Sequence, residues 1–290
     1  MADDLYRTDD AHGDGWHLML GDTCERILEL DEASVDLSVF SPPFASLFTY
    51  SQSVRDLGNC AGRAEFIEHF GYVVRGLLRA TKPGRLACVH VQQLTTTLST
   101  DGVISLTDFR GDLIRAFQSD GWIFHGEVTI DKDPQAQAIR TKAQALMFQT
   151  LRRDSLWSRP ALADYLMMFR APGKADVRVE TDIDNETWIE WARPVWYDIR
   201  ETDTLNTTVA REEADERHIC PLQLPLIERC VRLWSNPGEH VFSPFAGIGS
   251  EGFVAVEWGR RFTGIELKYS YWRTAVANVS KAATQMRIAV

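Results

Sequence analysis

Apolar and polar positions alternate along the chain in blocks that predict strands and helices in turn. The runs Trp16–Leu20 and Val35–Phe40 are short and apolar, and polar turns follow both of them, at Gly21-Asp22 and at Ser41-Pro42-Pro43. Short apolar runs bounded by turn residues predict buried strands. The first part of the chain therefore contributes two strands that end at polar turns.

Two amphipathic helices are predicted next. The first begins near Glu65, spaces its apolar residues three or four positions apart, and ends at Lys82-Pro83-Gly84. The second ends at Asp120-Gly121. Their apolar stripes are Phe66, Phe70, Val73 and Leu77 in the first, and Phe109, Leu113 and Phe117 in the second. Further strands are expected at Arg85–Val91, Trp122–Ile130 and Tyr165–Phe169. This alternation predicts a layered α/β sheet.

The final third carries the clearest pattern. A helical stripe with Pro225 in its first turn ends at Asn236-Pro237-Gly238. Its apolar members are Leu222, Leu226, Cys230 and Leu233. The elements expected after it are a strand at His240–Ser243, a helix at Ser250–Trp258, a strand at Arg261–Leu267 and a helix at Tyr271–Ala283.

Composition excludes several classes of protein. The 290 residues include 31 Lys and Arg against 41 Asp and Glu, which gives a formal charge of −10. No apolar run approaches the roughly 18 residues of a membrane span, and the acidic start does not resemble a secretory signal. Five cysteines form no CxxC pair, so reduced thiols in the cytoplasm are expected, and structural zinc is not.

Charge is distributed unevenly within this acidic chain. Residues 131–175 hold eight Lys and Arg and four Asp, a local excess of four positive charges that predicts a basic face. Residues 176–216 have weak periodicity and a cluster of aromatic residues, so we interpret them as a loop-rich insert. The aromatic residues of this insert are Trp188, Trp191, Trp196 and Tyr197.

A glycine-rich turn, Phe245–Gly249, joins a predicted strand to a predicted helix. Glycines there let a ligand approach the backbone, and the helix N-terminus favours negative charge. Glu266 ends the next strand, about 20 residues on, where an acid can accept hydrogen bonds from both ribose hydroxyls. Together they predict a nucleoside site without specifying the nucleoside.

Ser41-Pro42-Pro43-Phe44 follows an apolar strand, at the edge where open α/β sheets bind ligands. The prolines fix the backbone, so that a carbonyl oxygen and the Ser41 hydroxyl can point to one place. An acceptor pair beside the ring of Phe44 could hold the exocyclic amine of a planar base. An ordinary proline turn is the alternative.

The chain has Ser41-Pro42-Pro43-Phe44 near its N-terminus, then Pro244–Gly249 near its C-terminus, followed by Gly264-Ile265-Glu266-Leu267. This order of motifs resembles the amino-methylating DNA methyltransferases of the permuted β type. The resemblance covers nearly the whole chain and is greatest to solitary or prophage enzymes. It implies a Rossmann-like α/β fold that depends on S-adenosylmethionine, with a mixed, mostly parallel sheet flanked by helices. It further implies one permuted domain over residues 1–290, whose inserts at 131–216 serve DNA recognition or dimer contact.

The resemblance also implies residue roles. The catalytic tetrapeptide is Ser41, Pro42, Pro43 and Phe44. The residues implied for the cofactor are Asp22, Ser41, Cys220, Pro221, Leu222, Ser243, Pro244, Phe245, Ala246, Gly247, Gly249, Glu266 and Leu267. Ser243 departs from the Asp usual in the family, and its hydroxyl supplies no charge. Within the basic segment we expect DNA contacts from Lys142, Arg152, Arg153 and Arg159.

The reaction that the resemblance implies is direct methyl transfer to an exocyclic amine of a base flipped out of double-stranded DNA. No metal is expected, and no Pro-Cys pair offers the thiolate that methylation of a ring carbon needs. Serine in the first position of the tetrapeptide favours cytosine N4, whereas the solitary type favours adenine N6, which we prefer. A cytoplasmic homodimer is expected, because exposed aromatic clusters usually mark an interface.

Three alternatives stay open at this stage. An RNA or protein-glutamine methyltransferase must also hold a planar amine or amide. A catalytically silent DNA-binding module could use the same fold. A dinucleotide oxidoreductase would carry its glycine turn near the N-terminus and needs no Ser-Pro-Pro-Phe sequence.

Overall fold

A nine-stranded sheet forms the centre of the structure, a computed structural model of the chain. The residues that it describes are 6–43, 55–60, 62–96, 102–141, 146–181, 183–205 and 221–285. The strands of this sheet are β1 (Asp9–Gly13), β2 (Trp16–Leu20), β3 (Val35–Phe40), β4 (Thr81–Gln92), β7 (Ile123–Ile130), β8 (Asp164–Arg170), β9 (Val195–Trp196), β10 (His240–Ser243) and β11 (Arg261–Glu266). Two further strands, β5 (Leu94–Thr95) and β6 (Leu106–Thr107), pair with each other.

The order of strands across the sheet is β1-β2-β11-β10-β3-β4-β8-β7-β9. The five strands from β2 to β4 in this order are parallel, whereas β1 and β8 run antiparallel to their neighbours. β11, the last of the described strands in the sequence, lies between β2 and β10. The mixed, mostly parallel sheet predicted from the sequence is confirmed.

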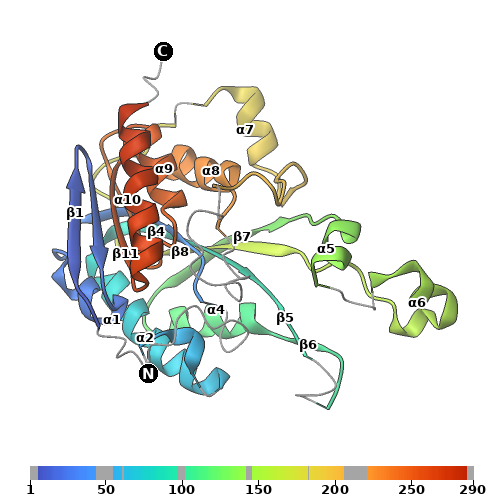
Figure 1. Ribbon diagram of the computed structural model, residues 1–290. Coiled ribbons are helices and arrows are strands. Elements are labelled where there is room, and N and C mark those ends of the chain that lie inside the picture. The colour runs from blue at the N-terminus through green and yellow to red at the C-terminus, as the bar shows by residue number, and fades with distance from the viewer. Residues whose placement is uncertain are drawn as a thin grey trace.

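Helices cover both faces of the sheet (Figure 1). α8 (Leu224–Trp234), α9 (Ser250–Glu257) and α10 (Tyr269–Thr284) pack on one face. α1 (Thr23–Arg26), α2 (Arg63–Ala80) and α4 (Phe109–Ser119) pack on the other. The described residues also form α5 (Pro134–Thr141), α6 (Phe148–Arg153), α7 (Asn185–Trp191) and the short 3-10 helices η1 (Ile27–Glu29), η2 (Leu57–Asn59) and η4 (Ser155–Trp157).

The apolar stripe of α2 shows why these helices form. Phe66, Phe70, Val73 and Leu77 are all fully buried against the sheet. Burying a side chain of this size stabilises the fold by about 1.5–3 kcal/mol before the entropy of ordering it is counted. The periodicity of the sequence therefore identifies the face of α2 that packs.

α5, α6 and η4 form an arm that projects from the ends of β7 and β8, away from the layered body (Figure 1). The arm lies within the basic segment 131–175. Its residues come from between two adjacent antiparallel strands, so both ends of the arm leave the same edge of the sheet.

The aromatic insert differs from the sequence-based expectation. β9, within residues 176–216, joins the main sheet beside β7. Trp196 is 1% exposed, and its indole N–H donates to the carbonyl of Trp191 at 3.0 Å. Of the roles expected for the tryptophans of this insert, Trp196 therefore takes the one in the core and is not available to DNA or to a second subunit. Trp188 and Tyr197 are exposed.

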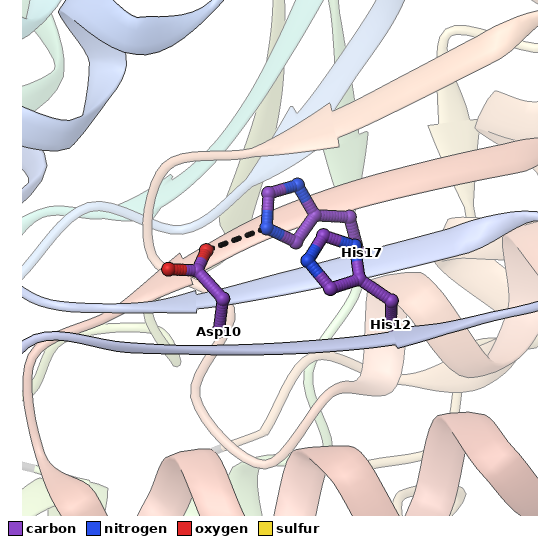
Figure 2. Close-up of side chains that lie close together, drawn as sticks. All are labelled: Asp10, His12 and His17. Atoms are coloured by element: carbon purple, nitrogen blue, oxygen red, sulfur yellow. Dashed lines mark hydrogen bonds and ion pairs between the residues drawn. The ribbon is translucent and has the colours of Figure 1, made fainter.

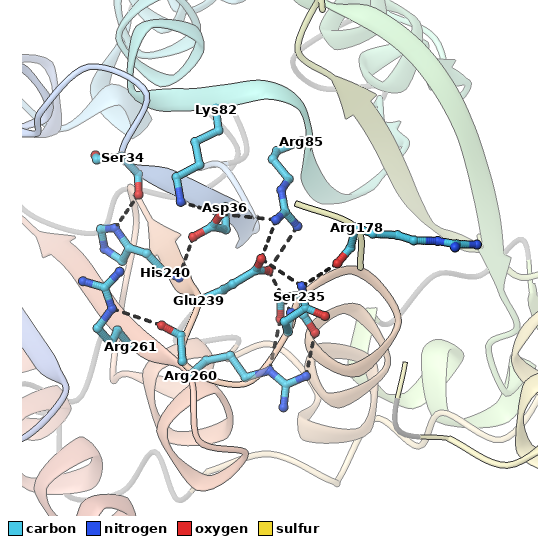
Figure 3. A network of polar contacts seen from close by, with 12 residues as sticks. Ser34, Asp36, Lys82, Arg85, Arg178, Ser235, Glu239, His240, Arg260 and Arg261 are labelled. Atoms are coloured by element: carbon cyan, nitrogen blue, oxygen red, sulfur yellow. Dashed lines mark hydrogen bonds and ion pairs between the residues drawn. The ribbon is translucent and has the colours of Figure 1, made fainter. Parts of the chain in front are cut away.

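A polar network joins the amino ends of the parallel strands (Figure 3). The guanidinium of Arg85 contacts the carboxylates of Asp36 and Glu239, and Lys82 donates to Asp36 at 2.7 Å. The backbone N–H of His240 also donates to Asp36. These contacts pair buried charges at the edge opposite to the one where ligands bind in such sheets, so we assign them to the fold.

Two expectations from the sequence concern the cysteines and the absence of a membrane span. Cys24, Cys60, Cys88 and Cys230 are free thiols. Within the described ranges, no helix combines the length and the apolar character that a bilayer crossing requires.

Candidate functional site

A cavity opens at the carboxyl edge of the sheet, where β2, β3, β10 and β11 end beside one another. Its lining combines segments that lie more than 200 residues apart in the sequence. The predicted site residues that line it are Asp22, Ser41, Pro42, Pro43, Pro221, Leu222, Pro244, Phe245, Ala246, Gly247, Glu266 and Leu267. The structure therefore brings the proline turn and the glycine turn to one place.

Two described residues predicted for the cofactor, Ser243 and Gly249, are not part of this lining. Phe44 and Cys220 lie outside the described residues. Ser243 is fully buried at the end of β10, and its Oγ has no hydrogen-bond partner in the described part of the chain. Gly249 caps α9 with a φ of +86°, and a Cβ there would lie 3.0 Å from the Cα of Ala275. Glycine is needed at 249 by conformation and by packing.

Sequence reasoning missed several lining residues. They are Thr23, Arg55, Asp56, Leu57, Ile248, Ser250, Glu251, Ile265, Lys268 and Tyr271. Most of them adjoin a predicted motif. Arg55, Asp56 and Leu57 belong to a separate segment with no recognisable pattern. Glu251 had a signal, because a charged residue stands in the first turn of the helix, directly after the glycine-rich turn.

Glu266 is held firmly at the end of β11. Its carboxylate accepts the N–H of Gly247 at 2.9 Å and the N–H of Lys268 at 2.7 Å. Burial raises the pKa of Glu266 to about 7, although these two backbone donors act in the opposite direction. The acid is thus fixed beside the glycine turn, with remaining lone pairs that can accept hydrogen bonds from a ligand.

A second acid enters the cavity from the turn after β2. Asp22 caps α1 by accepting the N–H of Cys24 at 2.9 Å, and its other oxygen accepts a hydrogen bond from Arg55 at 3.1 Å. Thr23 Oγ1 donates to the carbonyl of Pro244 at 2.5 Å. The hydroxyl of Thr23 thereby ties the turn after β2 to the turn after β10.

Ser41 stands at the end of β3, and its hydroxyl donates to the backbone carbonyl of His90 at 3.1 Å. A hydroxyl has one donor and two acceptor lone pairs. Because the donor is used inside the protein, the lone pairs of Ser41 Oγ are left for the cavity. The side chain can therefore accept a hydrogen bond from a ligand N–H.

A buried ionic network lies behind Ser41. Asp164, at the start of β8, contacts His90 Nε2 at 3.0 Å and Lys132 Nζ at 2.6 Å, and it accepts a hydrogen bond from Gln92 at 2.8 Å. Burial alone would raise the pKa of Asp164, but His90 and Lys132 outweigh it and hold the pKa below its usual value. Lys132 and Asp164 also mark the two roots of the arm.

The arm presents basic and apolar side chains to solvent. Arg152 and Arg153 end α6, and no ion pair joins either one to an acid among the described residues. Lys142 lies outside the described ranges, and Arg159 donates to the carbonyl of Pro160. The large apolar side chains exposed on the arm are Ile139, Met147, Phe148, Leu151, Leu156 and Trp157.

Three possible metal ligands meet on the β1–β2 hairpin. The donor atoms of Asp10, His12 and His17 lie within 4.8 Å of one another. Figure 2 shows the carboxylate of Asp10 facing the ring of His17, on which the ring of His12 stacks. Arg26 donates to both carboxylate oxygens of Asp10, at 2.8 and 2.9 Å. Because a cation already engages the acid, we assign these contacts to fastening the hairpin to α1.

A comparison with known protein families shows which family the chain belongs to. A family model described as DNA methylase, of the N6/N4 methyltransferase type, matches residues 35–277. The chain belongs to this family. The match includes the proline turn, the glycine turn and Glu266, so most of the cavity of this methylase is built from segments of the family, whereas Asp22 and Thr23 lie before the matched residues.

A curated relative of this methylase is the DNA adenine methyltransferase YhdJ of Escherichia coli K12. The two are 38% identical over 71 residues, which is 24% of each chain. The chain thus spans about a quarter of the length of that relative.

Solved structures share the fold. TTHA0409 of Thermus thermophilus, described as a DNA modification methylase and complexed with S-adenosylmethionine, superposes with a TM-score of 0.65 at 22% identity. That match covers 91% of this methylase and 94% of TTHA0409. The cytosine-N4-specific PvuII DNA methyltransferase superposes with a TM-score of 0.64 at 17% identity, over 94% and 92% of the two chains. The Rossmann-like methyltransferase fold expected from the sequence is confirmed.

Proposed function

We propose that this protein is a site-specific DNA methyltransferase that transfers a methyl group from S-adenosylmethionine to the exocyclic amine of a base. The observation that supports this most is that Ser41-Pro42-Pro43 and the Glu266 turn line one cavity. Direct transfer requires the methyl donor and the acceptor amine to be held side by side.

The residues of the cavity fit the cofactor. Glu266 can accept hydrogen bonds from the two ribose hydroxyls. A ligand can approach the backbone of Gly247 closely, because no protein atom lies within 4 Å of a Cβ built there. Asp22 lies in the turn after β2, where the N–H of its neighbour Gly21 donates to the carbonyl of Glu266 at 2.9 Å. When bound, S-adenosylmethionine supplies an electrophilic methyl group on a sulfonium sulfur.

Ser41 orients the acceptor amine. The lone pair of an exocyclic amine is delocalised into its base, which makes the nitrogen a weak nucleophile. Ser41 Oγ and the carbonyl of Pro42 accept the two N–H hydrogen bonds, and this localises the lone pair on the nitrogen. The hydrogen bond from Ser41 to His90 keeps the hydroxyl in the accepting orientation. No covalent intermediate with the protein is needed.

The base must leave the duplex to reach Ser41, at a cost of a few kcal/mol. We assign Phe44, the next residue of the tetrapeptide, to stacking on the flipped base, which offsets part of this cost. The arm supplies phosphate contacts through Arg152 and Arg153, which have no acidic partner among the described residues. Lys142 and Arg159 are assigned the same role.

Adenine N6 is our choice of target. The relative YhdJ, 38% identical over 71 residues, is named a DNA adenine methyltransferase. Cytosine N4 is the alternative, since the PvuII enzyme of the same fold is cytosine-N4-specific. The residues of the cavity can accept hydrogen bonds from either amine.

Sequencing of DNA with detection of modified bases tests both the reaction and the choice of adenine N6. Long-read sequencing of DNA from cells that express the chain should show N6-methyladenine within a short fixed motif. N4-methylcytosine would overturn the choice of base and keep the reaction. Unmodified DNA, together with no transfer of labelled methyl groups in vitro, would overturn the reaction itself.

We further infer one permuted domain over residues 1–290 that acts as a homodimer in the cytoplasm. Trp188 and Tyr197 remain exposed and can contribute to a dimer contact, whereas Trp191 packs against the guanidinium groups of Arg229 and Arg232. Light scattering tests the assembly: a dimer mass supports it, and a monomer mass at working concentration contradicts it.

A further inference from the structure

Glu251 is a buried acid in the cavity that the reaction above does not use. It lies in the first turn of α9, two residues after Gly249, is 5% exposed and lines the same cavity as Glu266. Its carboxyl accepts a hydrogen bond from its own backbone N–H. No other residue in the described part of the chain donates to it.

No cationic side chain among the described residues neutralises Glu251. Burial, followed in the same direction by the nearby charge of Glu266, raises the pKa of Glu251 to about 8. The cations of the cavity are engaged elsewhere: Arg55 pairs with Asp22 and Glu25, and Lys268 Nζ stands over the ring of Tyr271 at 4.5 Å. A buried carboxylate without a partner is costly, so an empty cavity favours the protonated acid.

A cationic ligand reverses this balance, because an opposite charge within a few ångströms favours the ionised carboxylate. S-adenosylmethionine carries a positive sulfonium sulfur and an ammonium group, whereas its product after transfer is a neutral thioether that keeps only the ammonium. Ser243 supplies no negative charge, since its hydroxyl is neutral, fully buried and outside the lining of the cavity.

We propose that Glu251 is the carboxylate that receives the positive charge of the cofactor and that it favours the sulfonium cofactor over the thioether product. The inference rests on the proposed function, because it takes S-adenosylmethionine as the ligand of this cavity. Binding of the cofactor near neutral pH drives a proton from the Glu251 carboxyl to the buffer. After transfer the sulfonium charge is gone, the carboxylate takes up a proton again, and the product is held less tightly.

The other charged or titratable side chains that line the cavity are Asp22, Arg55, Asp56, Glu266, Lys268 and Tyr271. Of these, Glu266 also has a raised pKa, of about 7, and it contributes to proton release whenever a ligand neutralises it. The test must therefore compare two ligands that share the ribose and differ in the sulfonium charge.

Isothermal titration calorimetry with S-adenosylmethionine and S-adenosylhomocysteine provides this comparison. The variant is Glu251→Gln, which copies the neutral acid in shape. The control is Glu257→Gln, the same change at the far end of α9 and outside the lining. Each titration is run at pH 7 in two buffers of different ionisation enthalpy, which gives the number of protons released.

We expect Glu251→Gln to weaken binding of S-adenosylmethionine about tenfold, to leave that of S-adenosylhomocysteine within about twofold, and to lower the number of protons released. Glu257→Gln should change none of these. Equal weakening of both ligands, or unchanged binding of both, would overturn the role of Glu251 while the proposed function stands. Wild-type protein that binds neither ligand would overturn the proposed function and this inference together.

Discussion

The hydroxyl of Ser41 donates to the backbone carbonyl of His90, 3.1 Å away, and the side chain of His90 contacts Asp164 at 3.0 Å. The backbone carbonyl of His90 thus sets the direction of the Ser41 hydroxyl, and Asp164 holds the ring of His90 in place. The same Asp164 binds Lys132 at the root of the arm. The group assigned to the target base and the element assigned to DNA share one buried support.

Ser41→Ala should lower the rate of methyl transfer about 10²- to 10³-fold, because the variant removes an acceptor that organises the reacting amine. Affinity for S-adenosylmethionine should stay within about threefold. A labelled-methyl assay and calorimetry measure the two quantities. Ser34→Ala, at the other end of β3, is the control and should keep its activity. Near-normal turnover in Ser41→Ala would remove the proline turn from the mechanism.

Glu266→Gln should weaken binding of S-adenosylmethionine by roughly 1.5–3 kcal/mol, since hydrogen bonds to a charged acceptor contribute about that much. The amide also loses one oxygen that accepts the N–H of Gly247 or Lys268. Calorimetry gives the change, with Glu257→Gln as the matched variant. An affinity equal to that of the wild type would place the ribose elsewhere.

The empty protein should lose stability as pH rises. The pKa values of Glu251 and Glu266 rise from 4.5 to about 8 and about 7 on folding, so the folded state holds their protons longer. Their stabilising contribution is complete below pH 4.5 and disappears as pH rises through 7 and 8, at about 1.4 kcal/mol per pKa unit at most.

Glu251→Gln isolates the part of this effect that comes from one side chain. In urea unfolding, the free energy of unfolding of the variant should match the wild type near pH 4 and exceed it near pH 9, because the amide never ionises. A difference that is constant from pH 4 to 9 would contradict a raised pKa at Glu251.

Asp164→Asn should destabilise the protein by about 3–5 kcal/mol, because it leaves the buried Lys132 without its counter-charge. Glu190→Gln, which breaks the exposed pair with Arg193, should cost at most about 1 kcal/mol. Chemical unfolding at pH 7 compares the two. Equal small losses would show that Lys132 finds another partner or water.

Arg152→Ala combined with Arg153→Ala should lower the salt dependence of DNA binding. Each phosphate contact contributes about 0.9 to the slope of log affinity against log salt, so the slope should fall by about 2. The matched double variant removes Arg63 and Arg115, which pair with Asp112. Fluorescence anisotropy between 50 and 200 mM salt measures both, and an unchanged slope would place these arginines away from DNA.

Local patterns predicted most of the sheet, because buried strands and amphipathic helices carry their own periodicity. The apolar residues of Val35–Phe40 are buried as the pattern predicts, whereas the burial of Asp36 and Ser38 in the same strand depends on the fold. β1, with the sequence DDAHG, has no apolar pattern and forms only because it pairs with β2. Trp196 looked like a surface aromatic, and its place in the core depends on β7, more than 60 residues away in the sequence.

Among the site residues, too, those in local motifs could be predicted and those placed by tertiary contacts could not. Contiguous motifs such as the turn Phe245–Gly249 could be placed at the cavity from sequence, because strand, turn and helix are local. Arg55 reaches the cavity through its ion pairs with Asp22 and Glu25, and these contacts require the folded chain. The burial of Glu251 likewise depends on packing between α9 and its neighbours, which no local pattern reports.

The position of β11 also sets when the protein can fold during synthesis. This strand, Arg261–Glu266, follows all the other described strands in the sequence, yet it lies between β2 and β10. Until it emerges, the β1–β2 hairpin has no neighbour to join the rest of the sheet, and two strand edges stay unpaired. Such edges pair readily with other chains. The β1–β2 hairpin therefore joins the sheet only after Arg261–Glu266 has been synthesised, and Glu266 reaches the cavity in the same event that closes the sheet.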